Sequence, residues 1–169
     1  IIIHSAITHP FANHKDYMGY LNSNIFSLVN TIEFAKKKKI KTFFYLSSIK
    51  LYGDIKNKKL NEESVISNPD ILGATKLLAE KIIELQNFKY YNIRLPGTLS
   101  YLINNKNRPW LNNVINNFID NKNFSINNPK SKFNNVIDTY EIYKFINFVM
   151  KKKKLIKNKT FILSSSKPI

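Results

Sequence analysis

The hydrophobic positions of the chain follow two spacings in alternation, and each spacing predicts a different element. Three runs, at residues 1–6, 41–48 and 90–96, are apolar at most positions and rich in β-branched or aromatic residues. Such runs are typical of strands buried on both faces of a parallel sheet. Segments with apolar residues at helical spacing lie between them. The order strand, helix, strand, helix, strand predicts an α/β fold with a doubly wound parallel sheet.

Two helices are predicted between these strands. The first begins near Asn24 and ends in a run of four lysines, and its expected inner face consists of Ile25, Leu28, Val29, Ile32 and Phe34 or Ala35. The second is expected to open with Asn68 as its cap and Pro69 at its first position. Its expected inner stripe is Ala74, Leu78, Ile82 and Leu85.

The pattern changes after Pro96. Residues 108–121 and 139–154 have the spacing of helices, and residues 124–126, 133–138 and 160–165 have the spacing of short strands. No linker rich in Gly, Pro or Ser divides the chain, and no internal repeat is present. We therefore expect residues 1–98 to form the main α/β part and residues 99–169 to add insertions and a last strand of the same sheet.

Both ends of the sequence look interrupted. Residues 1–3 already have the character of a core strand, and such a strand needs neighbours along its edges. The other end stops at "SSSKPI" without a closing turn or helix. We expect this sequence to be a segment of a longer polypeptide.

Composition adds a strong positive charge to this picture. The 169 residues carry a net charge of +16, yet 43% of them are hydrophobic, which argues for a folded chain. The lysine runs at residues 36–39 and 151–154 each close a helix-like segment, where cations favour the negative end of the helix dipole. We interpret them as solvated helix ends, with a phosphate-binding surface as the alternative. No aromatic repeat accompanies them, so no nucleic-acid partner is expected.

Several other classes of site are not indicated. The absence of cysteine excludes disulfides, thiolate catalysis and cysteine-based metal sites. His4, His9 and His14 recur every five residues without a carboxylate cluster, and we predict no metal site. No apolar run approaches the ~20 residues of a membrane span, and we expect no signal peptide. The expected compartment is the cytoplasm.

In series, the motifs resemble one family. The stretches are "IIIHSA", "NIFSLVNTIEFAKKKKIKTFFYLSSIKLYGD", "NEESVISNPDILGATKLLAEK", "YYNIRLPG" and "FNNVIDTYEIYKFI". Their order and spacing are similar to those of the extended short-chain dehydrogenase/reductases, the NAD(P)-dependent nucleotide-sugar epimerases and dehydratases, starting at that family's fourth strand. The resemblance implies a partial Rossmann-like sheet in residues 1–98 and a small substrate-binding portion in residues 99–169.

The resemblance also implies catalytic residues. Ser48 matches the family's Ser or Thr that bonds the reacting sugar oxygen, although a serine there could simply cap a turn. Lys76 matches the lysine that binds ribose hydroxyls and lowers the pKa of a tyrosine four positions earlier. That tyrosine position is Leu72 here. Leucine cannot transfer a proton, and losing a positioned acid/base typically costs about 10² to 10⁴ in rate.

Neighbouring residues do not restore the missing group. Ile71 is apolar too, and Tyr52 in "LYGD" matches a family tyrosine that is usually structural. Asn24 matches an asparagine of the helix after the fourth strand, with a simple helix cap as the alternative. Lys76 taken alone could be an ordinary exposed helix lysine.

Cofactor and substrate contacts follow from the same resemblance. NAD or NADP would contact Ser5, Ala6, Ser47, Lys76 and Pro96, and the nucleotide sugar would contact Ser48, Arg108 and Trp110. Arg108 and Trp110 could equally be a surface cation and a core aromatic. The four glycines, at positions 19, 53, 73 and 97, do not form the family's G-x-x-G-x-x-G turn. A homodimer is also implied.

Three functions remain open at this point. The first is an NAD(P)-dependent nucleotide-sugar epimerase, dehydratase or reductase, serving surface polysaccharide synthesis, with Leu72 at the tyrosine position. The second is a catalytically inactive relative that binds a nucleotide sugar or a protein. The third is a basic nucleic-acid-binding domain, which strongly salt-dependent binding to arbitrary DNA would indicate.

Overall fold

The computed structural model describes residues 1–7, 17–54, 59–99, 109–125, 136–152, 156 and 159–164. The chain divides into two compact units. The first unit comprises Ile1–Pro96 and Lys152–Leu163, and the second comprises Gly97–Lys151 and Ser164–Ile169.

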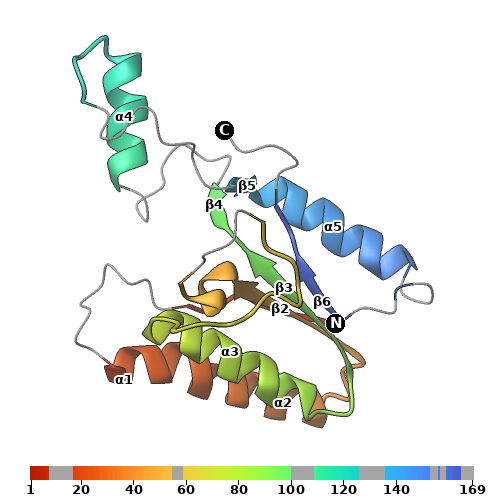
Figure 1. The fold of residues 1–169 in the computed structure, drawn as a ribbon. Helices are drawn as coiled ribbons and strands as arrows, with labels where there is room; N and C mark the ends of the chain where they lie inside the picture. Colours follow the sequence, from red (N-terminus) through yellow and green to blue (C-terminus); the bar gives the residue numbers. More distant parts are fainter. Residues whose placement is uncertain are drawn as a thin grey trace. The chain divides into compact units, whose positions relative to one another are not determined.

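A parallel sheet forms the centre of the first unit (Figure 1). In the described part of the chain it contains β1 (Ile2–His4), β2 (Thr42–Ser48), β3 (Lys89–Leu95) and β6 (Thr160–Ile162), in the order β1-β2-β3-β6. Every neighbouring pair is parallel. The three strands predicted from apolar runs are confirmed, as is the α/β fold class.

The first helical stretch begins earlier than predicted. It consists of α1 (Tyr17–Tyr20), the π-helical segment η1 (Leu21–Phe26) and α2 (Ser27–Lys37). The expected start at Asn24 is wrong, because Asn24 lies inside η1 with its side chain buried. A π-helical turn shifts which positions face the core, and this interrupts the 3.6-residue period that marks a helix in the sequence. The predicted end in the lysine run is confirmed, since α2 ends at Lys37.

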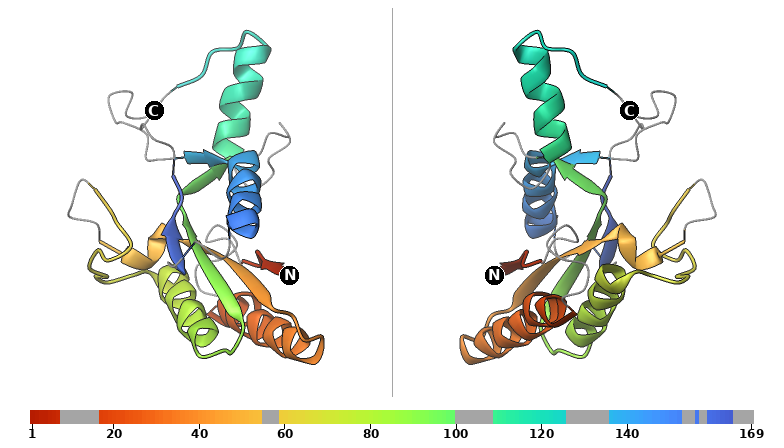
Figure 2. Two further views of the ribbon diagram at one scale, coloured as in Figure 1. Left: turned by 90° about the vertical axis from the view of Figure 1, so that its right-hand side faces the viewer. Right: turned by 90° about the vertical axis from the view of Figure 1, so that its left-hand side faces the viewer.

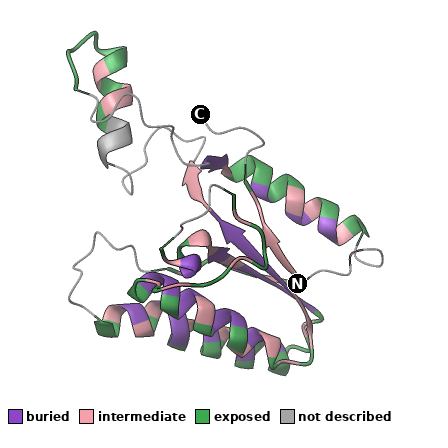
Figure 3. Ribbon diagram, viewed as in Figure 1, coloured by how far each residue is buried: buried purple, intermediate pink, exposed green. Residues whose placement is uncertain are grey.

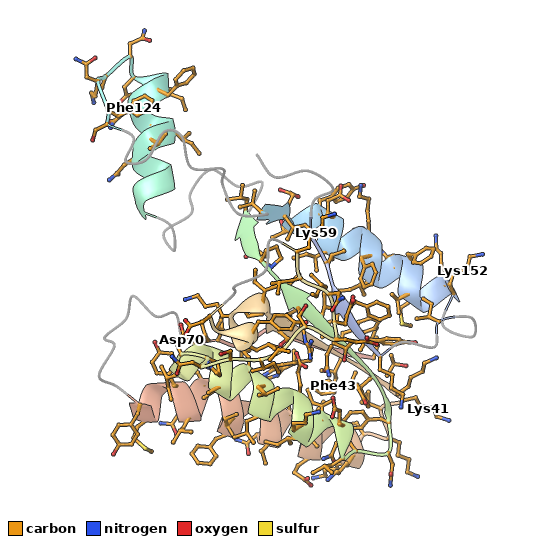
Figure 4. All side chains as sticks on the ribbon, viewed as in Figure 1. Lys41, Phe43, Lys59, Asp70, Phe124 and Lys152 are labelled. Carbon is orange, nitrogen blue, oxygen red and sulfur yellow. The ribbon has the colours of Figure 1, made fainter. Side chains whose placement is uncertain are left out.

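Helix α3 (Ile71–Glu84) begins two residues later than predicted. Its cap is Asp70, whose Oδ1 accepts a hydrogen bond from the Gly73 amide at 2.7 Å. Figure 4 labels Asp70 at this end of the helix. Asn68, the expected cap, instead has a left-handed backbone with φ of 49°. The cap prediction is therefore wrong, because Asp70 is the acceptor placed to reach the third helical amide.

The buried face of α3 also differs from the predicted stripe. Leu78 and Leu85 are exposed, Leu85 to 82%. The positions that are buried are Leu72, Gly73, Thr75, Lys76, Ala79, Glu80 and Ile83. Three of these residues are polar, so the apolar pattern alone selects the wrong face. Figure 3 shows the buried side of this helix turned towards the strands.

Helices α2 and α3 lie on the same face of the sheet (Figure 2). The core cluster between them consists of Ile25, Leu28, Ile32, Ala35, Phe43, Tyr45, Ala79 and Ile83. Four of the expected inner positions of the first helical stretch are thus confirmed. Val29 and Phe34 are exposed instead.

The second unit contains β4 (Gly97–Leu99), α4 (Pro109–Ile119), β5 (Val136–Asp138) and most of α5 (Thr139–Lys152). Strands β4 and β5 pair in parallel. The two predicted helices of this region are confirmed. Of the strand expected at residues 124–126, Phe124 and Ser125 are exposed and form no strand, and residue 126 lies outside the described residues. A short apolar run forms a strand only where a neighbouring strand pairs with its backbone. None of the helices in the described residues combines the length and apolar character that crossing a membrane requires.

Candidate functional site

The carboxyl ends of the parallel strands bring several of the predicted residues to one edge of the sheet. Ser48 ends β2 and pairs in register with Leu95 of β3, so Pro96 follows at the same edge. Ser5 and Ala6 follow β1, whose last residue pairs with Tyr45 of β2. Ligands of open parallel sheets bind outside these carboxyl ends. Ser5, Ala6, Ser48 and Pro96 therefore share the edge where such a site is expected.

Ser48 both ends a strand and caps the next turn. Its Oγ accepts a hydrogen bond from the Lys50 amide at 3.2 Å, which caps the short 3₁₀ helix η2 (Ile49–Tyr52). The turn-cap alternative is therefore present in the structure. Because the hydroxyl is the acceptor in this bond, its own hydrogen remains able to donate to a substrate oxygen.

Lys76 is buried, with 1% of its surface exposed. Its Nζ donates to the Leu46 carbonyl at 2.9 Å and lies 4.7 Å from the centre of the Tyr45 ring. Burial lowers the pKa of Lys76 to about 8, and the negative charge of Glu80 opposes this shift. The lysine is thus not an ordinary exposed helix lysine. Because this pKa lies above 7, the Lys76 ammonium is mainly cationic at neutral pH. It loses its proton closer to neutral pH than an exposed lysine does.

Asn24 connects η1 to the helix that carries Lys76. Its Nδ2 donates to Thr75 Oγ1 at 2.9 Å, and Thr75 Oγ1 donates to the Leu72 carbonyl at 3.0 Å. The alternative of a simple helix cap is wrong for Asn24, because the residue lies within the π-helical segment. The contact fixes the turn of α3 between Leu72 and Lys76.

Leu72 lies one turn before Lys76, so the two side chains leave the same face of α3. Its side chain is 4% exposed. Tyr52, the tyrosine of the "LYGD" stretch, is engaged elsewhere. Its hydroxyl donates to the Asn61 carbonyl at 2.9 Å and accepts a hydrogen bond from Arg94 Nη1 at 2.5 Å. Burial raises the pKa of Tyr52. A structural role for Tyr52 agrees with these contacts.

A buried ion pair, which the sequence analysis missed, lies between α3 and the sheet. Arg94 Nη2 donates to Glu80 Oε2 at 2.8 Å, and Arg94 Nε donates to Glu80 Oε1 at 3.1 Å. Both residues are buried. The available signal was an arginine inside a strand predicted to be buried, together with a glutamate four residues after Lys76. Buried charges of this kind need partners.

Ser47 contributes its side chain to this ion pair. Its Oγ donates to Glu80 Oε1 at 2.5 Å, and the residue is buried. The predicted cofactor contact at Ser47 would therefore have to come from the backbone.

His4 is a second buried titratable group near Lys76. Its ring stacks on those of Tyr45 and Phe43, with centroid separations of 5.9 and 6.2 Å. Burial, followed by the positive charge of Lys76, lowers the pKa of His4 to about 4. The imidazole is therefore neutral at physiological pH, and its Nε2 has no hydrogen-bond partner among the described residues.

The predicted substrate contacts fall where little is described. Arg108 lies outside the described residues, and so does the side chain of Trp110 in α4. Their proposed roles stay predictions. His9 and His14 also lie outside, and no group of three or more His, Cys, Asp or Glu side chains in the described ranges could hold a metal ion.

Comparisons with known proteins agree on one family and one fold. Residues 1–161 match the sequence model of the NAD dependent epimerase/dehydratase family. By sequence, none of the curated proteins matches the chain significantly.

Three solved structures illustrate the likeness of the fold. The UDP-N-acetylglucosamine 4-epimerase from Methanobrevibacter ruminantium has 18% identity and a TM-score of 0.80, over 99% of this chain and 55% of that chain. The UDP-glucuronic acid 4-epimerase from Bacillus cereus, in complex with NAD, has 17% identity and a TM-score of 0.80, over 99% and 54%. The UDP-glucose 4-epimerase from Brucella ovis, also with NAD, has 13% identity and a TM-score of 0.81, over 99% and 57%. This chain thus spans little more than half the length of the proteins it resembles.

Proposed function

Because the chain belongs to the NAD dependent epimerase/dehydratase family, we propose that it carries the Ser48 and Lys76 part of a nucleotide-sugar epimerase, dehydratase or reductase. The reaction would serve surface polysaccharide synthesis, with a UDP sugar as the first substrate class to test. The observation that carries the proposal is the placement of Lys76. Its cation is buried on α3 and bonded to the Leu46 carbonyl near the carboxyl end of β2.

The residues present fit one end of an NAD or NADP cofactor. The Lys76 ammonium has three N–H donors, and the described residues provide one acceptor, the Leu46 carbonyl. The remaining donors suit ribose hydroxyls at the edge of the sheet. The sequence contains no G-x-x-G-x-x-G turn for the pyrophosphate, so the fit concerns the nicotinamide-ribose end. A bound nicotinamide would supply hydride transfer.

The side chains of the site can orient a sugar more readily than they can exchange its proton. Ser48 can donate a hydrogen bond to the reacting sugar oxygen, and Lys76 can hold the cofactor ribose. Leu72 offers no proton donor or acceptor at the position one turn before Lys76. A missing acid/base costs about 10² to 10⁴ in rate, so we expect slow turnover from this arrangement.

A second candidate function is binding without catalysis. The buried Leu72 and the engagement of Tyr52 with Arg94 and Asn61 favour it, because Tyr52 is held by other contacts and does not take the missing role. Such a protein would bind a nucleotide sugar or a partner protein with the same fold. The cytoplasmic location and the homodimer stay predictions in both cases.

The substitution Leu72→Tyr in the full-length protein separates the two candidates. We would measure turnover of UDP sugars with NAD and with NADP, together with nucleotide-sugar binding by calorimetry. The enzyme proposal predicts detectable turnover in the natural protein and a rise of about 10² to 10⁴ in the variant.

The matched control is Ile71→Tyr, which adds the same phenol at the exposed neighbouring position. It should leave turnover unchanged. Binding without turnover in both the natural protein and Leu72→Tyr would favour the non-catalytic candidate. If neither protein binds a nucleotide sugar or a dinucleotide, the enzyme candidate and the nucleotide-sugar form of the second candidate are both rejected, and only binding of a partner protein remains.

A further inference from the structure

Helix α3 presents two opposite charges to the interior of the first unit. Lys76 and Glu80 are four residues apart, so they lie on the same face of the helix. Each is 1% exposed. Burying a charge is costly unless it is paired, which means that this arrangement needs a physical account.

The Glu80 carboxylate is fixed from the sheet. Ser47 on β2 donates to its Oε1, and Arg94 on β3 donates to both oxygens, with distances of 2.5 to 3.3 Å. Arg94 is fixed in turn, because its Nη1 donates to the Glu62 carbonyl at 2.9 Å. These hydrogen bonds therefore hold the Glu80 carboxylate in one position between α3 and the sheet.

The groups that face Lys76 come from several elements. His4 on β1 is neutral above a pKa of about 4, and β2 provides the Tyr45 ring and the Leu46 carbonyl. Arg94 on β3 is bonded to Glu80. Among the described residues, Glu80 is the acidic group that raises the pKa of Lys76 against the effect of burial.

We propose that Glu80 is a positioning residue for Lys76, one turn away on the same buried face of α3, and that its carboxylate keeps the Lys76 ammonium charged beside the Leu46 carbonyl. Ser47 and Arg94 fix the carboxylate that performs this task. The benefit to cofactor binding rests on the proposed function, whereas the effect on Lys76 itself does not.

A purely structural role of Glu80 makes a different prediction. If Glu80 only neutralises Arg94, its loss lowers stability, and any shift in the Lys76 midpoint comes from the unpaired Arg94 cation and disappears when Arg94 is also made neutral. If Glu80 acts on Lys76, removing its negative charge moves the titration midpoint of that one lysine. The midpoint is therefore the decisive quantity.

The experiment uses the full-length protein labelled with ¹³C at lysine Cε, with the Lys76 signal assigned by its loss in Lys76→Arg. The pH titration is repeated for Glu80→Gln, which keeps the shape and an acceptor for Arg94 but removes the charge. We expect the Lys76 midpoint to fall by about 1 to 2 pH units, since an opposite charge at short range shifts a pKa by about 1–3 units.

Two further variants make the outcome specific. Glu80→Asp keeps the charge and should restore most of the midpoint. Glu84→Gln, one turn further along α3, removes a carboxylate that pairs with exposed Lys81 and should leave the Lys76 midpoint unchanged. An unchanged midpoint in folded Glu80→Gln would overturn the proposal.

Glu80→Gln leaves Arg94 charged and buried, and this could prevent folding. The double variant Glu80→Gln with Arg94→Gln replaces the ion pair by neutral amides, a change that proteins often tolerate. The Lys76 midpoint should fall in this variant as well, and an unchanged midpoint would count against the proposal. A shifted midpoint together with no turnover in Leu72→Tyr would reject the enzyme function and leave the role of Glu80 standing.

Discussion

Asn24 shows at the scale of one residue how the site is held. Its amide is fully buried in η1 and donates to Thr75 Oγ1, one residue before Lys76. An asparagine in that place reads equally well as a surface cap, since Asn is common at helix starts. The sequence shows that residue 24 is an asparagine, but it does not show that the side chain points into the core. That direction results from the π-helical segment.

We expect Asn24→Ala to lower the free energy of unfolding by about 1–3 kcal/mol, because it removes a buried hydrogen bond and leaves a small cavity. Asn22→Ala is the control, since Asn22 is exposed in the same π-helical segment. Urea unfolding of both variants measures the difference. Equal stability of the two variants would contradict the role given to Asn24.

The charged residues of the interior were also hidden from sequence reasoning. Glu80 and Arg94 belong to residue types that are almost never fully buried unless they are paired, so a sequence reader places them on the surface. The burial of Lys76 was equally hard to predict from the sequence. Its match to a family motif indicated a role, but only the fold places its ammonium beside the Leu46 carbonyl.

At the scale of the element, helix α3 depends on a close approach to η2. A Cβ added to Gly73 would lie 2.3 Å from the Lys50 carbonyl oxygen. That distance is far inside van der Waals contact with backbone atoms that cannot easily move. The glycine therefore allows α3 to lie directly against the turn that follows Ser48.

Gly73→Ala should accordingly destabilise the protein, although alanine is the better helix former by about 1 kcal/mol. We expect overpacking to lower the free energy of unfolding by about 1–3 kcal/mol. Ala74→Gly is the matched control at the exposed neighbouring position, with an expected loss of at most about 1 kcal/mol. A Gly73→Ala variant as stable as the natural protein in thermal unfolding would show that η2 moves to make room for the added methyl group.

The positions of the strands and helices were predicted better than the face that each helix buries. Strands β2 and β3 are largely buried over their seven residues, and apolar and aromatic side chains predominate in the middle of β2 and on either side of Asn92 in β3. Helix α3 was found, but its inner stripe was assigned to Leu78 and Leu85. The true inner face includes Lys76 and Glu80, whose polar character hides the period. Periodicity finds a buried face only when that face is apolar.

At the scale of the whole molecule, burial couples stability to pH. His4 has a folded pKa of about 4 against an ordinary value of 6.5, so the unfolded chain binds more protons between these values. Stability must therefore fall as the pH drops from about 6.5 towards 4. The lowered pKa of Lys76 acts in the same sense at higher pH, where stability rises between about 8 and 10.5.

The acid part of this dependence can be tested with His4→Phe, which keeps a ring to stack on Phe43 and Tyr45. Urea unfolding at pH 7.5, 6.0 and 5.0 should show the natural protein losing stability relative to the variant as the pH falls. The difference in free energy of unfolding between the two proteins at pH 7.5 serves as the reference, because His4 is neutral there and the difference reflects packing alone. Stability curves that run parallel over this range would mean that His4 does not titrate as described.

The sheet order carries a consequence for the time course of folding. Strand β6 pairs with β3, with Asn92 beside Thr160, and nearly all of the second unit lies between them in the sequence. During synthesis, β1, β2 and β3 leave the ribosome well before β6 exists, so the side of β3 that receives β6 stays open on the nascent chain. Open strand edges invite pairing with other chains. The speed of translation between β3 and β6 therefore sets how long the edge of β3 stays unpaired in a newly made chain and able to pair with another chain.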